Sequence, residues 1–283
     1  MEECEHTMAD ACKRQRVVHL TPAEQCRQRP DMYIGSVAET TLVVPTFGEA
    51  EVVMRSIPFR HGFLSLMNEL VTNALDNQHR PGTMTHIAIK WDGTALTVEN
   101  DGATLSVLNT VEGHPELLVA FGWMHSGTNF DQEDTGRKAN RYTAGRNGVG
   151  GKACLVFSAA YEVSASNVAE GKELTIRWTD GYRSAPTLSK VKEYKGTRNR
   201  TRVVWQPDLS VLGTADGGLP DHVDAVCSLV AHNASLCASA GVVVKYNGRQ
   251  IKPRTPEQFC KLLGASAPLA ACTVVNDAGV EVL

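Results

Sequence analysis

The 283-residue chain lacks several features that would assign it to a common class of protein. No apolar run is long enough to span a bilayer, so no membrane is expected as a partner. The first residues, MEECEHTMADACKRQR, have no apolar core of the kind that a secretory signal needs. The formal net charge of −3 argues against a domain whose main task is to coat nucleic acid.

Paired cysteines are also lacking. The eight cysteines are scattered and form no CxxC pair, which argues against a zinc ribbon or a thioredoxin-like site. They are too few for a disulfide scaffold of this length, which suggests reduced thiols inside a cell. What the chain does have is a hydrophobic content of 42%, enough to bury a sizeable core.

The spacing of apolar residues and turn signals predicts a chain of mixed helices and strands. Residues 1–20 are interpreted as a flexible arm, and Thr21, Pro22 and Glu24 form a helix-start pattern whose helix should stop near Arg29. Further helices are predicted at 63–79, 115–125, 151–158, 221–241 (ended by Gly241) and 256–263. Strands are predicted in 86–102 (a hairpin around Asp92-Gly93), the second half of 153–166, 173–181, 200–208 and 242–252.

This order of elements favours an α+β fold. Strands outnumber helices, and hairpins are mixed with longer connections. We therefore expect a two-layer α/β sandwich with a mixed, mostly antiparallel sheet and helices on one face. Residues 126–151 form a long polar, glycine-rich loop, and a loop of this length inside a compact domain is usually functional.

The first polar cluster lies on the helix predicted at 63–79. Glu69, Asn73 and Asp76 fall at i, i+4 and i+7 on one face, with Asn77 beside them. The face could simply be a solvated surface opposite the apolar stripe. Alternatively, the Asn73 amide oxygen could coordinate Mg²⁺ while Glu69 orients or deprotonates a water molecule.

The second cluster is VENDG at 98–102, directly after a predicted strand. Asn100, Asp101 and Gly102 suit an ordinary turn. The alternative is base recognition, in which a short polar side chain at the mouth of a pocket accepts a hydrogen bond from a purine amine.

The third cluster is TAGRNGVGGKACL at 143–155, with four glycines in the seven positions from Gly145 to Gly151. It is not a Walker P-loop, because Lys152 is followed by Ala153 and the glycine spacing is wrong. It fits the loose GxGxxA pattern, but it follows a polar loop and not a strand, so a dinucleotide site is disfavoured. A nest of backbone N–H groups leading into a helix favours an anion, with a flexible surface loop as the alternative.

Taken in order, the three clusters resemble the boxes of the GHKL ATPases, which share the Bergerat nucleotide-binding fold. ELVTNALDN is similar to the N-box of that family, VENDG to its first glycine box and GRNGVGGK to its second. Four further segments resemble the N-terminal ATPase region of eukaryotic type II DNA topoisomerases: RPDMYIGS (29–36), FGWMHSGTNFD (121–131), GRNGVGGKACLVFS (145–158) and WQPDL (205–209). The resemblance covers roughly residues 17–283.

The resemblance implies a role for each matching residue. Glu69 matches the general base that activates water, and Asn73 matches the Mg²⁺ ligand. Asn100 matches the residue that contacts adenine, and Thr201 matches a threonine that holds adenine through water. The remaining residues of the implied ATP site are Asp76 and Asn77 on the helix, Gly127, Thr128 and Asn129 near ribose and phosphate, and Arg146, Asn147, Gly148, Val149, Gly150, Gly151 and Lys152 in the lid over the triphosphate.

Some positions depart from the pattern of this family. Ala103 stands where many relatives have a second glycine, Val149 where a tyrosine is common, and Gly127 where a serine is common. Relatives also carry a tyrosine in the N-terminal arm that reaches the partner subunit, whereas no tyrosine precedes Tyr33 here.

The resemblance also implies an organisation and a function. We expect a flexible arm at 1–20, a GHKL ATPase domain at 21–265 and the first strand of a truncated transducer domain at 266–283, in a fragment of a longer enzyme. The expected function is the ATP-hydrolysing clamp of a type II DNA topoisomerase, with ATP and Mg²⁺ as cofactors, DNA as partner of the full-length enzyme, and a homodimer on nucleotide binding. A chaperone- or mismatch-repair-type GHKL ATPase is the alternative. The expected location is the nucleus, with a mitochondrion or other DNA-containing organelle as the alternative.

Overall fold

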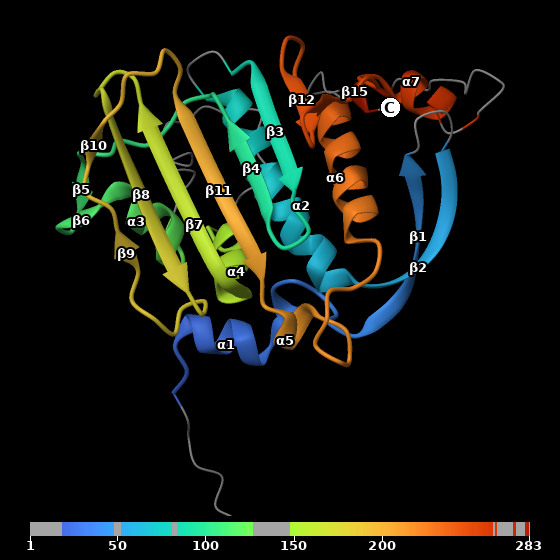
Figure 1. The fold of residues 1–283 in the computed structure, drawn as a ribbon, viewed down its shortest axis with the longest axis horizontal. Helices are drawn as coiled ribbons and strands as arrows, with labels where there is room; N and C mark the ends of the chain where they lie inside the picture. Colours follow the sequence, from blue (N-terminus) through green and yellow to red (C-terminus); the bar gives the residue numbers. More distant parts are fainter. Residues whose placement is uncertain are drawn as a thin grey trace, which may run out of the picture.

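In the computed structural model, the described residues are 19–47, 52–80, 84–126, 148–262, 264, 274–275 and 281–282. They form two layers, a nine-stranded sheet and a set of helices packed behind it (Figure 1). This arrangement confirms the α+β sandwich with helices on one face.

The main sheet is mixed and mostly antiparallel. Its strands, in spatial order, are β10 (Lys192–Glu193), β8 (Lys172–Thr179), β7 (Ser158–Asn167), β11 (Arg200–Pro207), β4 (Leu96–Asn100), β3 (His86–Trp91), β12 (Val243–Tyr246) and β13 (Arg249–Gln250), with β9 (Thr187–Leu188) paired to β8. Every pair in it is antiparallel except β12 with β3. The β3–β4 hairpin forms where the alternation around Asp92-Gly93 predicts it.

Apolar side chains from the sheet and the helices meet in one core. Helices α2 (His61–Asp76), α3 (Glu116–Gly122) and α4 (Gly150–Val156) lie behind the sheet in Figure 1. Phe63 of α2 and Trp205 of β11 are fully buried, and their rings meet edge to face with centroids 5.4 Å apart. Aromatic pairs of this geometry stabilise a core beyond their burial alone.

Helix α1 (Pro22–Gln28) begins and ends where the sequence predicts. Thr21 and Glu24 form a capping box, in which the Glu24 carboxylate also accepts from the Thr21 amide at 2.8 Å. Arg27 then donates to Asp208 at 2.6 Å and to the Val156 carbonyl at 3.2 Å, which fastens α1 to the end of β11 and to α4. The short helix η1 (Pro30–Met32) follows.

A long hairpin of β1 (Glu39–Phe47) and β2 (Val52–Arg60) was not predicted. Its two prolines and irregular alternation conceal the strand pattern in the sequence. One face buries Val44, Ile57 and Phe59 in the core. The hairpin packs on helix α6 (Val223–Cys237), where the Phe47 ring stacks on His232 at a centroid distance of 3.6 Å.

Helix α6 ends earlier than expected, at Cys237 and not at Gly241. Ala238 is already extended (φ −74°, ψ 135°), and Gly241, at φ +95°, instead serves the turn into β12. The other short elements are η2 (Asn77–His79), β5 (Thr110–Val111), β6 (His114–Pro115), α5 (Leu209–Leu212) and α7 (Pro256–Leu262). Two short strands, β14 (Val274–Val275) and β15 (Glu281–Val282), pair with each other where a single strand was expected.

Within the described part of the chain, no helix has the length and apolar character to cross a membrane.

Replacing Phe63 with alanine should strongly destabilise the fold. The side chain is fully buried against Phe59 and Trp205, so its loss leaves a cavity in the centre of the core. We expect the free energy of unfolding to fall by about 3–5 kcal/mol in urea denaturation. The control is Met32→Ala, because Met32 is 67% exposed and should change stability by less than about 0.5 kcal/mol. Equal effects of the two substitutions would contradict this account of the core.

Candidate functional site

Helix α2 carries two polar side chains on the face opposite its buried stripe. Leu66, Leu70 and Ala74 face the core, which turns Glu69 and Asn73 outward on consecutive turns. Both side chains are exposed among the described residues. The predicted spacing is therefore present on a helix that the core holds rigidly.

The start of helix α4 lies directly against these two side chains. A Cβ atom added to Gly150 would lie 1.8 Å from Glu69 Oε2, and one added to Gly151 would lie 3.1 Å from Asn73 Nδ2. Only a glycine at position 150 allows the Glu69 carboxylate to approach the helix start this closely. The structure thus brings the first and third polar clusters together.

Gly148 and Val149 lead into α4. Gly148 has φ +58°, and Val149 is the N-cap residue, which makes no side-chain cap hydrogen bond. The first intrahelical bonds run from the amides of Lys152 and Ala153 to the Val149 carbonyl, at 3.0 and 2.8 Å. The amides of Gly150 and Gly151 consequently have no acceptor within the helix, as at any helix start. The helix spans Gly150–Val156, close to the expected 151–158.

The Glu69 carboxyl group has a raised pKa. Although the side chain keeps contact with solvent, the protein around it removes water from the charged form, and the negative charge of Asp76 adds repulsion. A carboxylate with a raised pKa is a better proton acceptor than an ordinary surface glutamate.

Asp76 and Asn77 are buried, at 8% exposure each, and do not lie on the outer face of α2 as the helical spacing suggested. Asn77 belongs to η2, where the helix tightens after Asp76. Its Nδ2 donates to Asn100 Oδ1 at 2.6 Å and to the Ala103 carbonyl at 2.7 Å. Asn77 therefore connects the end of the first cluster to the second.

Asn100 ends strand β4 and faces the helix layer. Its Oδ1 accepts from Asn77 Nδ2 and from the Gly102 amide at 3.2 Å. No described residue accepts a hydrogen bond from its Nδ2. The expectation that the oxygen accepts from a purine amine therefore does not match this conformation, in which Nδ2 is the group left available.

Thr201 lies next to Asn100 across the sheet. The two residues are direct partners in the β11–β4 register, so their side chains share a face. Thr201 Oγ1 donates to Thr104 Oγ1 at 2.9 Å. The structure thus places both Asn77 and Thr201 next to Asn100. Their spacing in the sequence did not predict these contacts.

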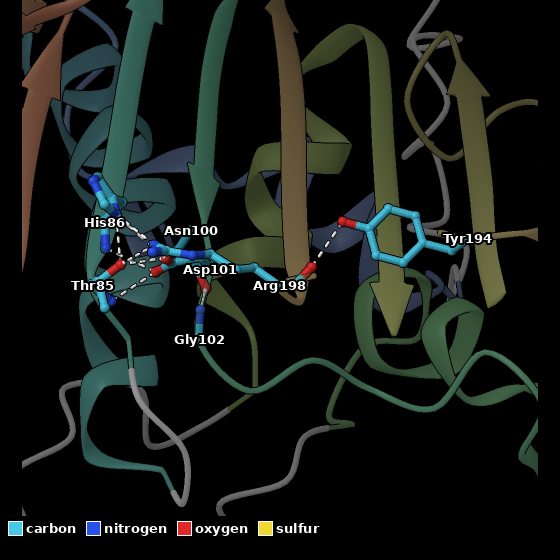
Figure 2. Close-up of polar contacts among 7 residues, drawn as sticks. All are labelled: Thr85, His86, Asn100, Asp101, Gly102, Tyr194 and Arg198. Atoms are coloured by element: carbon cyan, nitrogen blue, oxygen red, sulfur yellow. Dashed lines mark hydrogen bonds and ion pairs between the residues drawn. The ribbon is translucent and has the colours of Figure 1, made fainter. Parts of the chain in front are cut away.

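Asp101 is at the centre of a second network, drawn in Figure 2. Its Oδ1 accepts from the backbone amides of Thr85 and His86, both at 2.8 Å, and its Oδ2 accepts from Thr85 Oγ1 at 2.5 Å and from Arg198 Nη1 at 3.0 Å. Burial alone would raise the pKa of Asp101, but these hydrogen bonds outweigh it and hold the pKa at about 2. Tyr194 in turn donates to the Arg198 carbonyl at 2.8 Å.

This network shows which residues the sequence reasoning missed. Thr85 and Arg198 hold the segment that contains Asn100, Asp101 and Gly102, yet they lie 16 and 97 positions away from Asp101. Arg198 sits in an exposed loop with several basic neighbours, and no spacing singles it out.

Lys152 is placed differently from the expected lid contact. Its side chain is buried, at 5% exposure, and Nζ donates to the Ser126 carbonyl at 2.5 Å. Burial lowers its pKa to about 8. The amine in this conformation therefore holds Ser126, the last described residue before Gly148.

Five predicted site residues lie outside the described part of the chain. They are Gly127, Thr128, Asn129, Arg146 and Asn147.

The residues around Asn73 fit a magnesium ion held mainly by a bound ligand. No group of three or more His, Cys, Asp or Glu side chains in the described ranges could hold a metal ion alone. Asn73 offers one neutral oxygen-bearing amide at an exposed position beside α4. Mg²⁺ commonly takes one or two protein oxygens and completes its shell with phosphates and water.

Comparisons with known proteins agree on one family. No family model matches the chain. DNA topoisomerase 2 of Trypanosoma brucei brucei is 32% identical over 273 residues, covering 92% of this chain and 21% of the relative. DNA topoisomerase 2 of Crithidia fasciculata is 33% identical over 215 residues, covering 73% of this chain and 16% of the relative.

Solved structures give the same result for the fold. The ATPase region of Saccharomyces cerevisiae topoisomerase II superposes with a TM-score of 0.77 at 23% identity, covering 87% of this chain and 64% of that one. The ATPase and transducer domains of DNA topoisomerase II from Balamuthia mandrillaris superpose with a TM-score of 0.74 at 23% identity, covering 87% and 63%.

The sheet order, the helix layer and the juxtaposed boxes define a domain of the GHKL, or Bergerat, class. Within this class the chain belongs to the eukaryotic type II DNA topoisomerases and matches their N-terminal ATPase region. It spans about a fifth or less of the length of the curated relatives named above.

Replacing Gly150 with alanine should move the Glu69 carboxylate. The new Cβ would overlap Oε2, so the side chain must turn toward solvent, where the desolvation that raises its pKa is smaller. We expect an NMR titration of the Glu69 carboxyl group to show its pKa falling toward the ordinary value for glutamate, near 4.3. Gly151→Ala is the matched control, since its Cβ meets only Asn73. A pKa of Glu69 that stays raised in Gly150→Ala would refute the proposed contact.

Replacing Asp101 with asparagine should lower stability in a pH-dependent way. The folded pKa lies below the unfolded value, so the charged carboxylate stabilises the fold above about pH 4 and this contribution is lost as the pH falls toward 2. We expect a loss of about 2 kcal/mol in urea unfolding at pH 7 and a smaller difference near pH 3. A difference between wild type and variant that does not depend on pH would show that the charge is not responsible.

Proposed function

We propose that this chain is the ATP-binding and ATP-hydrolysing clamp domain of a type II DNA topoisomerase. The observation that carries the proposal is the close approach of Glu69 and Asn73 on α2 to the glycines that begin α4. A proton acceptor, an oxygen ligand and the backbone amides at the start of α4 then lie at one place. Phosphoryl transfer needs mainly this combination of positioning and charge stabilisation.

In this proposal Glu69 acts on the attacking water. Its pKa, raised by burial and by the charge of Asp76, makes its carboxylate a better proton acceptor than an ordinary surface glutamate. The first-turn amides of α4, preceded by Gly148 and Val149, would hydrogen-bond phosphate oxygens that face them. Asn73 would hold Mg²⁺, which supplies neutralisation of phosphate charge when bound.

The base of the nucleotide would lie at the other end of α2, beside Asn100 and Thr201. Both residues share one face of neighbouring strands, and Asn77 fills the space between Asn100 and the helix. The Asp101 network would keep the end of β4 in place while the base binds.

The partners and the location follow from the family. ATP would dimerise two copies of this domain, and the closed gate would hold a DNA segment that the full-length enzyme passes through a cleaved duplex. We propose a nuclear location, with a DNA-containing organelle as the alternative. The alternative function, that of a chaperone- or mismatch-repair-type GHKL ATPase, is not favoured, because the relatives and structures described above are topoisomerases.

Replacing Glu69 with glutamine in the enzyme of which we propose this chain is a part should separate binding from hydrolysis. Glutamine keeps the shape of the side chain but cannot accept the proton from water. We expect ATP hydrolysis to fall about 10²- to 10⁴-fold, while calorimetry shows a non-hydrolysable ATP analogue still bound with Mg²⁺. In the unmodified enzyme, hydrolysis should also decline as the pH drops through the raised pKa of Glu69.

Asn68→Ala is the control for this experiment, because Asn68 is an exposed neighbour of Glu69 on the same helix. It should leave hydrolysis unchanged. Hydrolysis that survives in Glu69→Gln would remove Glu69 from the mechanism, and absence of analogue binding to the unmodified enzyme would refute the proposed function itself.

A further inference from the structure

A chain of hydrogen bonds leads from the Ala103 carbonyl through Asn77 to Asn100. Asn77 Nδ2 donates to Ala103 O at 2.7 Å and to Asn100 Oδ1 at 2.6 Å, and the Gly102 amide donates to the same Oδ1 at 3.2 Å. Asn77 and Asn100 are buried, at 8% and 6% exposure. Buried amides joined in this way have little freedom to rotate.

The donors and acceptors permit only one orientation of the two amides. A backbone carbonyl can only accept, so Asn77 must turn Nδ2 toward Ala103, and the same Nδ2 reaches Asn100. Asn100 must then turn Oδ1 toward both Asn77 Nδ2 and the Gly102 N–H. If the Asn100 amide were flipped, its NH₂ group would face two other donors.

We propose that Asn77 is a positioning residue that determines which end of the Asn100 amide faces the nucleotide base. This inference rests on the proposed function, because it assumes that a base lies beside Asn100. Asn77 acts through Asn100 and not by touching the nucleotide. An amide held in advance discriminates between bases, because it cannot turn to suit one with the opposite hydrogen-bonding pattern.

The packing of Asn77 supports a positioning role. A Cβ on Gly102 would come within 2.9 Å of Asn77 Nδ2 and 3.1 Å of its Cγ, so the glycine backbone covers the amide closely. Asn77 Oδ1 is buried with no hydrogen-bond partner among the described residues. Within the described part of the chain, the side chain thus leaves its buried acceptor unpaired, which is costly, and directs its donor to Ala103 and Asn100.

Binding of ADP and IDP to the chain, measured by calorimetry, tests this proposal. The hypoxanthine of IDP has a carbonyl and a ring N–H where adenine has an amine and a bare ring nitrogen, so the two bases present opposite patterns at one edge. A held amide offers the same group to both bases, so we expect the unmodified chain to bind one of the two nucleotides more tightly than the other. In Asn77→Ala the freed Asn100 amide can turn to suit either base, so the ratio of the weaker to the tighter dissociation constant should fall by about fivefold.

Further variants separate positioning from direct contact and from misfolding. Gly102→Ala presses a methyl group against Asn77 while keeping both amides, and it should lower the same ratio. In the Asn100→Ala background, adding Asn77→Ala should change the ratio no further. Asn167→Ala is the matched control, because Asn167 is a half-buried amide that holds the Leu105 carbonyl without contacting Asn100. It should leave the ratio unchanged.

Each other outcome is decisive. Equal weakening of ADP and IDP binding in Asn77→Ala would mean a merely structural role, and an effect that persists without Asn100 would mean direct contact with the nucleotide. Either result overturns this inference and leaves the proposed function in place. If neither nucleotide binds the unmodified chain, the proposed function fails and this inference with it.

Discussion

The close approach of helices α2 and α4 is the constraint on which the rest of the structure depends. The Glu69 carboxylate occupies the space that a side chain at position 150 would need. Behind this contact, the buried stripe of α2 and the apolar residues of α4, such as Leu155, hold both helices against the sheet. A rigid core therefore sets the distance between a carboxylate and a helix start, which flexible loops could not maintain.

The other end of the site depends on hydrogen bonds and less on packing. The β11–β4 register places Thr201 opposite Asn100, and η2 places Asn77 against Asn100. Asp101, one residue later, faces a different set of groups and joins β4 to the start of β3 and to Arg198. Asn100 thus faces Asn77, whereas Asp101 holds the end of β4 against β3, because successive side chains point to opposite faces of a strand.

Prediction from the sequence succeeded where a local pattern corresponds to a local structure. The helix start at Thr21 and the hairpin around Asp92-Gly93 formed as expected, and the helical spacing of 63–79 corresponds to α2 (His61–Asp76) followed by η2. It was wrong at the end of α6, where Ala238 leaves the helix before Gly241 is reached. It also missed the β1–β2 hairpin, whose burial pattern depends on packing against α6, a segment far away in the chain.

The sequence by itself determined the types of residue at the site and their local elements, since helical spacing and glycine content act over a few residues. Only the tertiary structure decided that Gly150 contacts Glu69, that Asn77 is buried against Asn100, and that Lys152 turns its amine to the Ser126 carbonyl. These contacts join residues 23 to 81 positions apart. Residues so far apart in the sequence come into contact only when the core packs. Burial of apolar surface, and not local propensity, brings their helices and strands together.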